Sequence, residues 1–291
     1  MKDIGSSYGR LGDAVDNIEV FWGDYSPDMQ LADLHVHTRR SDGWWTPERL
    51  AEAAVARGLS AIGVTDHDDI AAGYAVADYC ARRSLPLRVY PGSEISARCE
   101  PPDICGRHDV HVLGFDLTEE VPPWQSIEAT VEAILRQGGF VVMPHPRQPG
   151  RGFPTFDQIL ALDHAVSVEI YNAAVRDTRA LGAHRGEPDI NLEARAFYQA
   201  NRTRLAGATG GTDAHFRTVG RGLTAYRGDL RAALAAGQTA VLYRPERERM
   251  LPWDPIGYFA GLRRLDRRRQ AQYGPRPTTD VQRSADRRGG S

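Results

Sequence analysis

The sequence has few cysteines, a single lysine and no long apolar run. Its three cysteines, Cys80, Cys99 and Cys105, are odd in number and show no Cys-x-x-Cys spacing. That pattern argues against a disulfide framework and against a cysteine-based zinc site. The N-terminus has no apolar leader, and no segment is long and apolar enough to span a bilayer. We therefore expect a cytoplasmic, reducing environment and no membrane partner.

Charge of neither sign predominates. The 291 residues include 36 Lys and Arg and 38 Asp and Glu, for a net charge of -2. This balance gives no global electrostatic argument for binding nucleic acid or a membrane surface. Lys2 is the only lysine, and this bias towards arginine makes any single arginine weak evidence for a phosphate site. With 41% hydrophobic residues, the chain has the composition of a globular protein, and its length suits one barrel-sized domain as well as two smaller ones.

A His-x-His pair stands near the start of the chain. The segment Asp33-Leu34-His35-Val36-His37 alternates apolar and polar residues, as a short strand does. Positions i and i+2 of a strand point to one face, so His35 and His37 can present two imidazoles side by side to a divalent metal. An isolated pair of this kind is more often a surface or hydrogen-bonded pair. A metal site therefore requires further ligands from the rest of the chain.

Strand-like and helix-like segments alternate after this pair. We expect strands at 59–65, 87–91, 110–115, 140–143, 165–171, 205–209 and 239–243. We expect helices at 47–57, 70–83, 124–136, 156–162, 192–201, 229–236 and 256–270, and an irregular excursion over 172–190. This alternation predicts an α/β fold with a parallel sheet or barrel and external helices. The expected boundaries are an N-terminal extension at 1–30, a barrel domain at 31–270 and a tail of disordered composition at 271–291.

Potential metal ligands recur along the chain, mostly at or near the ends of predicted strands. In order they are His35, His37, Asp42, His67, Glu94, His111, His145, Asp213 and His215. Barrels and open α/β sheets build their sites at the carboxyl ends of their strands. A cavity lined by this many carboxylates is electrostatically costly without cations, so several bound metals are the simplest explanation. Mixed histidine and carboxylate ligation fits Mn, Fe or Zn better than Mg or Ca.

Six short motifs resemble the successive motifs of the PHP (polymerase and histidinol phosphatase) family. They are D-L-H-V-H-T with S-D-G, then T-D-H-D, G-S-E-I-S, H-V-L-G-F-D, P-H-P and G-T-D-A-H. The resemblance runs from about Asp33 to about Tyr243. It implies a distorted (β/α)7 barrel with two or three divalent metal ions at the carboxyl ends of its strands. It also implies hydrolysis of phosphate esters.

Carried over position by position, the resemblance implies three metal sites, of which the first two share a bridging glutamate. The three sets are His35, His37, Glu94 and Asp213; Glu94, His111 and His145; and Asp42, His67 and His215. No ligand position is missing, which argues against a non-catalytic relative. His108 competes with His111, but only His111 stands within H-V-L-G-F-D.

The chemistry implied by the resemblance uses a hydroxide bridging two metals as the nucleophile, because cations lower the pKa of bound water. The leaving alkoxide then needs a proton or a third cation. His67, His215 and the neighbouring Asp68 are the candidates, and the sequence does not choose among them. Asp66 and Asp68 flank His67, and we expect one to orient its imidazole and the other to cap the next helix.

Several other residues lie near the predicted site. Three arginines lie where they could reach a substrate phosphate: Arg147, Arg217 and Arg221. Arginine matches phosphate geometry, but a solvated loop arginine explains each position equally well. A predicted strand ends in Glu169, Tyr171 and Asn172, which would contact substrate. Gly210-Gly211 would permit a close backbone approach.

The sequence thus predicts a metal-dependent phosphoesterase that acts on a small phosphorylated molecule: a phosphomonoester of a nucleotide, sugar or biosynthetic intermediate. The alternative is a nuclease or a cyclic or oligonucleotide phosphodiesterase with the same centre. A PHP-like binding module without catalysis is the third reading. The neutral charge weighs mildly against nucleic acid, and we interpret the basic stretch from Arg263 to Arg269 as a solvated helix face. The sequence does not indicate an oligomeric state.

Overall fold

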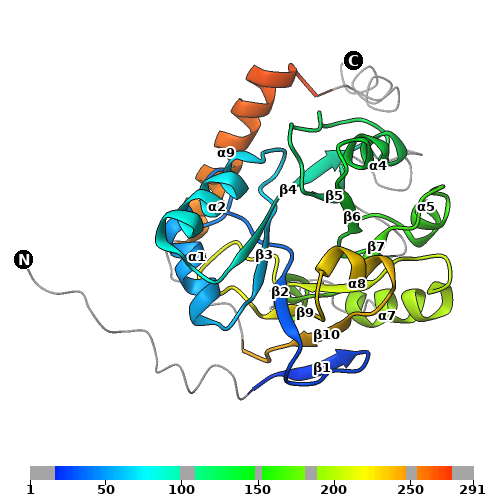
Figure 1. Cartoon of the computed structure of the whole chain (residues 1–291). Helices are drawn as coiled ribbons and strands as arrows, with labels where there is room; N and C mark the ends of the chain where they lie inside the picture. The colour runs from blue at the N-terminus through cyan, green and yellow to red at the C-terminus, as the bar shows by residue number, and fades with distance from the viewer. Residues whose placement is uncertain (1–16, 99–108, 148–152, 181–188, 247–253, 277–291) are drawn as a thin grey trace, which may run out of the picture.

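A computed structural model describes residues 17–98, 109–147, 153–180, 189–246 and 254–276. Within these residues a 10-stranded sheet curls around the centre of the molecule, in the order β1-β10-β9-β2-β3-β4-β5-β6-β7-β8 (Figure 1). The strands are β1 (Glu19–Trp22), β2 (Gln30–Asp33), β3 (Ala61–Val64), β4 (Arg88–Ala97), β5 (Val110–Phe115), β6 (Phe140–Met143), β7 (Ser167–Asn172), β8 (Ala208–Gly211), β9 (Gly222–Tyr226) and β10 (Ala240–Tyr243). The helices are α1 (Pro47–Ala56), α2 (Ala71–Arg83), α4 (Ile127–Arg136), α5 (Phe156–Leu160), α6 (Ala173–Ala180), α7 (Ile190–Asn201), α8 (Leu230–Ala235) and α9 (Asp254–Tyr273).

The α/β class is confirmed, but the strands do not all run in one direction. β2, β3 and β4 are parallel, as are β6, β7 and β8. β5 pairs antiparallel with both β4 and β6, and β9 is antiparallel to β2 and β10. The expectation of a uniformly parallel sheet is therefore wrong, and the (β/α)7 count is not confirmed. A run of strand and helix patterns gives the order of elements along the chain but not the direction in which each strand joins the sheet.

One end of the curled sheet, β8, closes against β9 and β10 through glycine. A Cβ atom on Gly210 would lie 2.7 Å from the Leu223 carbonyl oxygen, and one on Gly222 would lie 2.0 Å from that of Gly211. Only residues without a side chain allow these backbones to approach so closely. The close approach expected at Gly210-Gly211 is thus confirmed.

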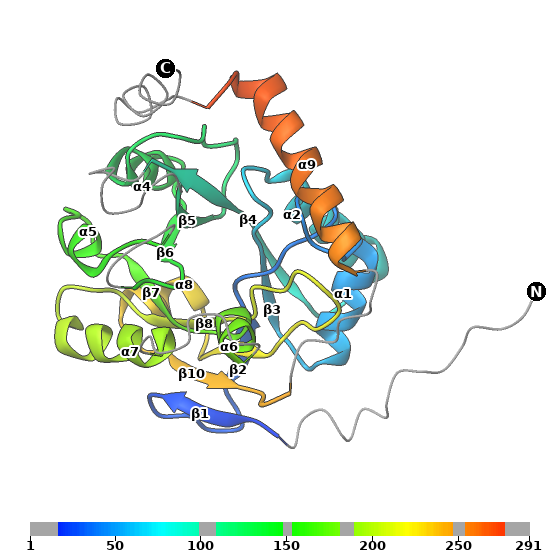
Figure 2. The ribbon, with the colours of Figure 1, turned by 180° about the vertical axis from the view of Figure 1, so that it is seen from behind.

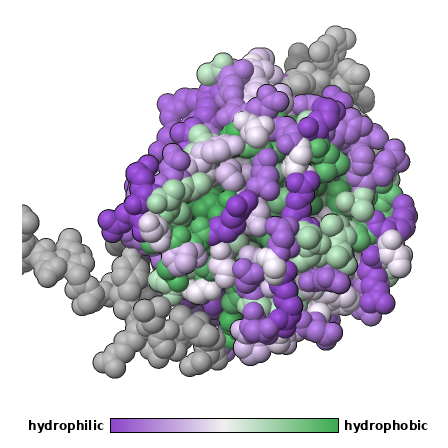
Figure 3. Space-filling view, viewed as in Figure 1, coloured by the Kyte–Doolittle hydropathy of each residue, from purple (hydrophilic) through white to green (hydrophobic). Residues whose placement is uncertain are grey.

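Helices pack on the outside of the sheet, as expected. α1 begins after Thr46, whose side chain accepts a hydrogen bond from the Arg49 amide, and has Pro47 in its first turn. α6 was not predicted, because residues 172–190 read as an irregular excursion. β1 lies within the expected N-terminal extension and pairs with β10. Figure 3 shows hydrophilic side chains over most of the rim of one face, with apolar side chains between them.

The last helix takes a separate course. α9 lies beside α1 and α2 in both ribbon views (Figures 1 and 2). It buries Leu265. Gly261 packs so closely against Asp42 that a Cβ atom added to Gly261 would lie 2.8 Å from the Asp42 Cα. The helix expected at 256–270 is therefore present, and it contacts the segment that carries a predicted metal ligand. Across the described residues, every helix is too short or too polar to cross a membrane.

Candidate metal centre

The His-x-His segment lies between two other ligand-bearing segments. The Thr65 amide donates to the Val36 carbonyl at 2.9 Å on one side, and the His37 amide donates to the Ala214 carbonyl at 3.2 Å on the other. These bonds extend β2 beyond its last ladder pair, so His35 and His37 point into the space where β3 and β8 also end. Backbone hydrogen bonds thus bring the ligand-bearing segments together at the strand ends, as expected.

The first predicted ligand set comes together around Glu94 Oε2. This oxygen lies 3.2 Å from His35 Nε2 and 3.1 Å from His37 Nε2. Asp213 Oδ1 lies 3.2 Å from His37 Nε2 and 3.5 Å from His35 Nε2. The four residues offer one ligand atom each within 4.8 Å of one another. Such a group can hold one metal ion.

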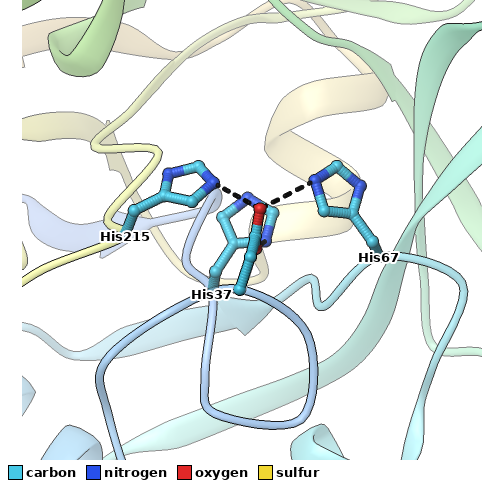
Figure 4. A group of neighbouring side chains, drawn as sticks. His37, His67 and His215 are labelled. Carbon is cyan, nitrogen blue, oxygen red and sulfur yellow. Dashed lines mark ion pairs between the residues drawn. The ribbon is translucent and has the colours of Figure 1, made fainter. Parts of the chain in front are cut away.

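The third predicted set gathers around Asp42 and gains a member. Asp42 Oδ2 lies 3.2 Å from His215 Nε2 and 3.7 Å from His67 Nε2. Figure 4 shows these two imidazoles on either side of His37, with the pairs marked by dashed lines. His37 Nδ1 lies 3.6 Å from Asp42 Oδ1, and all four residues form one donor group. His37 can therefore turn one nitrogen to each of two sites.

The second predicted set lies around the other oxygen of Glu94, although the donor group among the described residues there holds His67 in place of His145. Its Oε1 lies 2.7 Å from His111 Nδ1 and 3.3 Å from His145 Nε2. His67 Nδ1 also approaches Glu94, at 3.5 Å from Oε2, and it joins Glu94 and His111 in a third donor group. Glu94 thus faces histidines with both oxygens, as a bridging ligand would. His108, the competitor of His111, lies outside the described residues.

Buried charges of opposite sign face one another in this cluster. Burial alone would lower the pKa of His35, but the carboxylates of Asp213 and Glu94 raise it well above its ordinary value. The same balance raises the pKa of His37 to about 10. Burial opposes ionisation of the carboxylates as well, yet the facing imidazoles hold the pKa below the usual range in Asp42, Glu94 and Asp213. The site therefore favours ionised carboxylates that need positive charge beside them.

The donor atoms fit metal ions better than they fit one another. Among the described residues, several buried ligand atoms lack a hydrogen bond of normal geometry: His35 Nε2, both ring nitrogens of His37, His67 Nδ1 and Asp213 Oδ1. Buried polar atoms are nearly always paired, so this concentration of unpaired donors calls for a further ligand. Imidazole and carboxylate together suit a divalent transition metal.

A glutamate supports the first ligand set from behind. Glu169 Oε1 lies 3.2 Å from His35 Nδ1, and its Oε2 accepts hydrogen bonds at 3.0 Å from the His145 amide and from Asn172 Nδ2. Asn172 Nδ2 also reaches Asp213 Oδ2 at 3.2 Å. For Glu169 and Asn172 these contacts favour a role in orienting ligands over the expected substrate contact, since carboxylates commonly fix metal-bound histidines in this way. An acidic residue within a buried strand was the sequence signal.

Two other buried aspartates shape the loops instead of binding metal. Asp66 accepts hydrogen bonds from the backbone amides of Thr38 and Ser41 at 3.0 and 2.9 Å, which fixes the loop between His37 and Asp42. Asp33 accepts the amides of Thr212 and Gly220 at 2.9 and 2.7 Å. Burial raises the pKa of Asp33 to about 6, although these hydrogen bonds oppose the shift.

The acids around His67 take different roles from those expected. Neither Asp66 nor Asp68 caps α2, since the Ala71 amide donates to Asp69 Oδ1 at 2.8 Å. Asp68 Oδ1 accepts the Ser96 amide at 2.7 Å, and its other oxygen pairs with Arg269. With both oxygens engaged, Asp68 is a poorer candidate for proton donor than His67 or His215.

The basic stretch on α9 is more than a solvated face. Arg268 pairs with Asp69 and donates to the His67 carbonyl at 2.7 Å, while Arg269 pairs with Asp68 and the Ser96 hydroxyl. The interpretation of Arg263 to Arg269 as solvated is therefore wrong for its last part. The sequence missed these contacts because they join residues about 200 positions apart.

The three arginines predicted to contact substrate lie in different surroundings. Arg147 is buried against the Phe153 ring, 5.8 Å from its centroid. Arg217 pairs with Asp254 and stacks on Trp44 at 4.4 Å. Arg221 is 1% exposed, which favours a structural role. Substrate contact remains a prediction for Arg147 and is less expected for the other two.

A pocket opens beside the third ligand set. Its volume is about 280 Å³, and Asp42 and His215 lie in its wall. The remaining wall includes the aromatic side chains of Trp44, Phe216 and Tyr258, the last of which belongs to α9. A small molecule in this pocket would contact both the ligand cluster and the C-terminal helix.

Comparison with known proteins agrees with this geometry. The model of the PHP domain matches residues 33–140. An uncharacterized protein of Methanocaldococcus jannaschii is 31% identical over 160 residues, which is 50% of this chain and 84% of that protein. The 5'-3' exoribonuclease Rnm of Salmonella typhimurium is 39% identical over 87 residues, 30% of this chain and 28% of that protein. The 3',5'-nucleoside bisphosphate phosphatase of Chromobacterium violaceum is 36% identical over 94 residues, 32% of this chain and 30% of that protein.

Solved structures extend the likeness along most of the chain. A two-domain Bacteroides vulgatus protein containing a predicted PHP-like metal-dependent phosphoesterase superposes with a TM-score of 0.54 at 18% identity, over 79% of this chain and 68% of that one. A Chromobacterium violaceum amidohydrolase with bound sulfate gives 0.50 at 20% identity, over 74% and 98%. At these identities the likeness concerns the fold. The segment that matches the family model and the relative of which this chain covers 84% show that the chain belongs to the PHP domain family. The matched segment spans less than a third of the exoribonuclease and of the bisphosphate phosphatase.

Proposed function

We propose that this protein is a metal-dependent phosphoesterase that hydrolyses a phosphomonoester of a small molecule, such as a nucleotide, sugar or biosynthetic intermediate. The observation that carries the proposal is the set of three donor groups joined through Glu94 and His37, with a small pocket beside them. Divalent Mn, Fe or Zn bound there would activate water and offset the negative charge of a phosphoryl group.

The protein's own residues prepare this chemistry by fixing tautomers. A backbone carbonyl can only accept, so His215 Nδ1, 3.0 Å from the Asp213 carbonyl, carries the proton and leaves Nε2 as a lone-pair donor. Glu169 holds the proton of His35 on Nδ1 in the same way and leaves Nε2 facing Glu94 and Asp213. Ligands held in one tautomer lose little freedom when a metal binds.

We expect residues at the solvent-exposed side of the cluster to deliver the proton to the leaving group. The side chain of His215 is 18% exposed and lines the pocket, whereas His35 and His37 are fully buried. We therefore keep His215 and His67 ahead of Asp68, with the histidine that acts as the acid holding its proton on Nε2 and binding no metal through that atom. Arg147 stays our candidate for gripping the substrate phosphate, because it follows His145, a proposed ligand of the second site, by two residues.

An exonuclease or a cyclic phosphodiesterase is the alternative function. It is supported by the exoribonuclease match and by a phosphoribosyl 1,2-cyclic phosphate 1,2-diphosphodiesterase of Eggerthella lenta, 37% identical over 92 residues. The small pocket favours the monoesterase, because a volume of about 280 Å³ suits one small ligand better than a polymer strand.

The test is a substrate panel on the full chain, stripped by a chelator and then reloaded with Mn, Fe or Zn. The panel holds nucleoside and sugar phosphomonoesters, a cyclic nucleotide and a short 5'-phosphorylated RNA. We expect inorganic phosphate from at least one monoester, only after metal is added, with two or three metal ions per chain by elemental analysis. Release of nucleotides from the RNA without phosphate from any monoester would favour the alternative. Equal activity before and after metal removal would refute both.

A further inference from the structure

We propose that α9 forms a specificity wall for the substrate, in which Tyr258 and Arg264 select a leaving group that is flat and negatively charged. This inference rests on the proposed function, since it concerns the part of the substrate that remains after the phosphoryl group is removed. α9 lies outside residues 33–140, the segment that matches the family model. The pocket is therefore part family scaffold and part C-terminal helix.

The wall is fixed in place at its C-terminal half. Arg268 and Arg269 pair with Asp69 and Asp68, the two residues that follow His67. Gly261 packs against the backbone of Ser41 and Asp42, with no room for a side chain. Two ligand-bearing loops thus hold the helix at several points. Its N-terminal half, which contains Tyr258, is positioned by these contacts relative to the metal ligands.

Flat surfaces dominate the inner part of the pocket. The Tyr258 ring lies 5.6 Å from the His215 imidazole and 6.1 Å from the Phe216 ring. Trp44 lines the same pocket, and Arg217 lies over its ring at 4.4 Å. Aromatic faces of this kind bind planar groups through stacked or edge-to-face contacts. A substrate whose phosphate reaches the third ligand set would place its next atoms against these rings.

Positive charge lies in the same pocket. Arg39 and Arg264 line it together with Asp42 and His215. Arg39 is held by its Nε, which donates to the Trp44 carbonyl at 2.9 Å, and Arg264 is exposed. By contrast, Arg217 is already paired with Asp254. An anionic substituent on the flat group would be attracted by Arg264 and Arg39 while the phosphate faces the metal ligands.

The experiment uses three phosphonates, whose P–C bonds the enzyme cannot hydrolyse. Methylphosphonate has no ring, phenylphosphonate adds a ring, and 4-carboxyphenylphosphonate adds a ring and a charge. Each is titrated calorimetrically into the Mn-loaded full chain. We expect affinity to rise in that order for the unaltered protein.

Two variants, each with a matched control, test which residues cause this rise in affinity. Tyr258→Leu should reduce the preference for phenyl over methyl by about tenfold, the scale of one aromatic stacking contact. Its control is Phe259→Leu, a neighbouring ring that is 60% exposed and does not line the pocket. Arg264→Gln should reduce the preference for the carboxyphenyl compound by about threefold, as expected for an exposed charge pair. Arg263→Gln, exposed on the same helix, is its control.

The outcomes separate this proposal from the proposed function. Equal binding of all three phosphonates, or no binding of any, would overturn the role of α9 even if the enzyme hydrolyses phosphate esters. So would equal losses in a variant and its control. Graded binding that depends on Tyr258 and Arg264, in a protein that hydrolyses nothing in the panel, would support the wall and refute the esterase.

Discussion

The two ends of the metal centre differ in how deeply their ligands are buried and in how well other residues support them. At the inner end, His35 and His37 are fully buried, and Glu169 and Asn172 support the ligands from behind. At the outer end, the side chains of His215 and His111 are 18% and 26% exposed. A buried, supported donor set exchanges its ion slowly, whereas an exposed one can exchange ions and admit substrate. We infer that the inner end serves as a permanent anchor and the outer end as the place of reaction.

The strongest test of this comparison removes the residue common to both ends. Glu94→Gln keeps the shape of the side chain but loses the charge that faces five histidines. We expect kcat/KM to fall by about a thousandfold or more, because charge stabilisation at both ends is lost. Elemental analysis should show fewer metal ions per chain. Retained metal with near-normal turnover would mean that Glu94 does not bridge.

A pair of histidine variants should separate the two ends. His215→Ala should remove the outer ion and lower kcat by about a hundredfold while the inner ion remains. His35→Ala should remove the inner ion and destabilise the fold as well, since it takes away one of the imidazoles that offset the buried charges of Glu94 and Asp213. Metal content and the midpoint of thermal unfolding, measured on both proteins, check this. Identical metal loss in the two variants would contradict a division between the ends.

A supporting residue should give a smaller effect. Glu169→Gln keeps the hydrogen-bonding shape but weakens the hold on the His35 proton, so metal affinity should fall by about 10- to 100-fold. Competition with a chelator of known affinity measures it. Glu132→Gln on the exposed face of α4 is the control, because Glu132 contacts only Arg136 among the described ion pairs. Unchanged affinity in Glu169→Gln would return Glu169 to the role of substrate contact.

The smallest effect is expected at the outer edge. Arg269→Gln breaks the ion pair with Asp68 and the hydrogen bond to Ser96, which are partly exposed contacts. We expect a loss of about 1 kcal/mol in unfolding free energy and a modest rise in KM, with metal content unchanged. Denaturant unfolding and steady-state kinetics measure these quantities. A loss of metal in Arg269→Gln would show that α9 supports the ligands themselves.

Much of the centre could be predicted from the sequence because its ligands stand in short local motifs. His35 and His37 share a strand face whatever the rest of the chain does, and Asp213 and His215 repeat that spacing. The roles of Glu169 and Arg269 could not be predicted in the same way. Each depends on a partner from a distant segment, and a single sequence shows no sign of that pairing. The same reason explains why the antiparallel direction of β5 was missed.

The position of α9 in the sequence also bears on how the protein is made. Each of the nine candidate ligands precedes Phe216, and α9 begins at Asp254. During synthesis the complete donor set therefore leaves the ribosome before the helix that covers it. The candidate ligands can therefore meet metal ions before Arg268 and Arg269 dock α9 against the segment that carries His67.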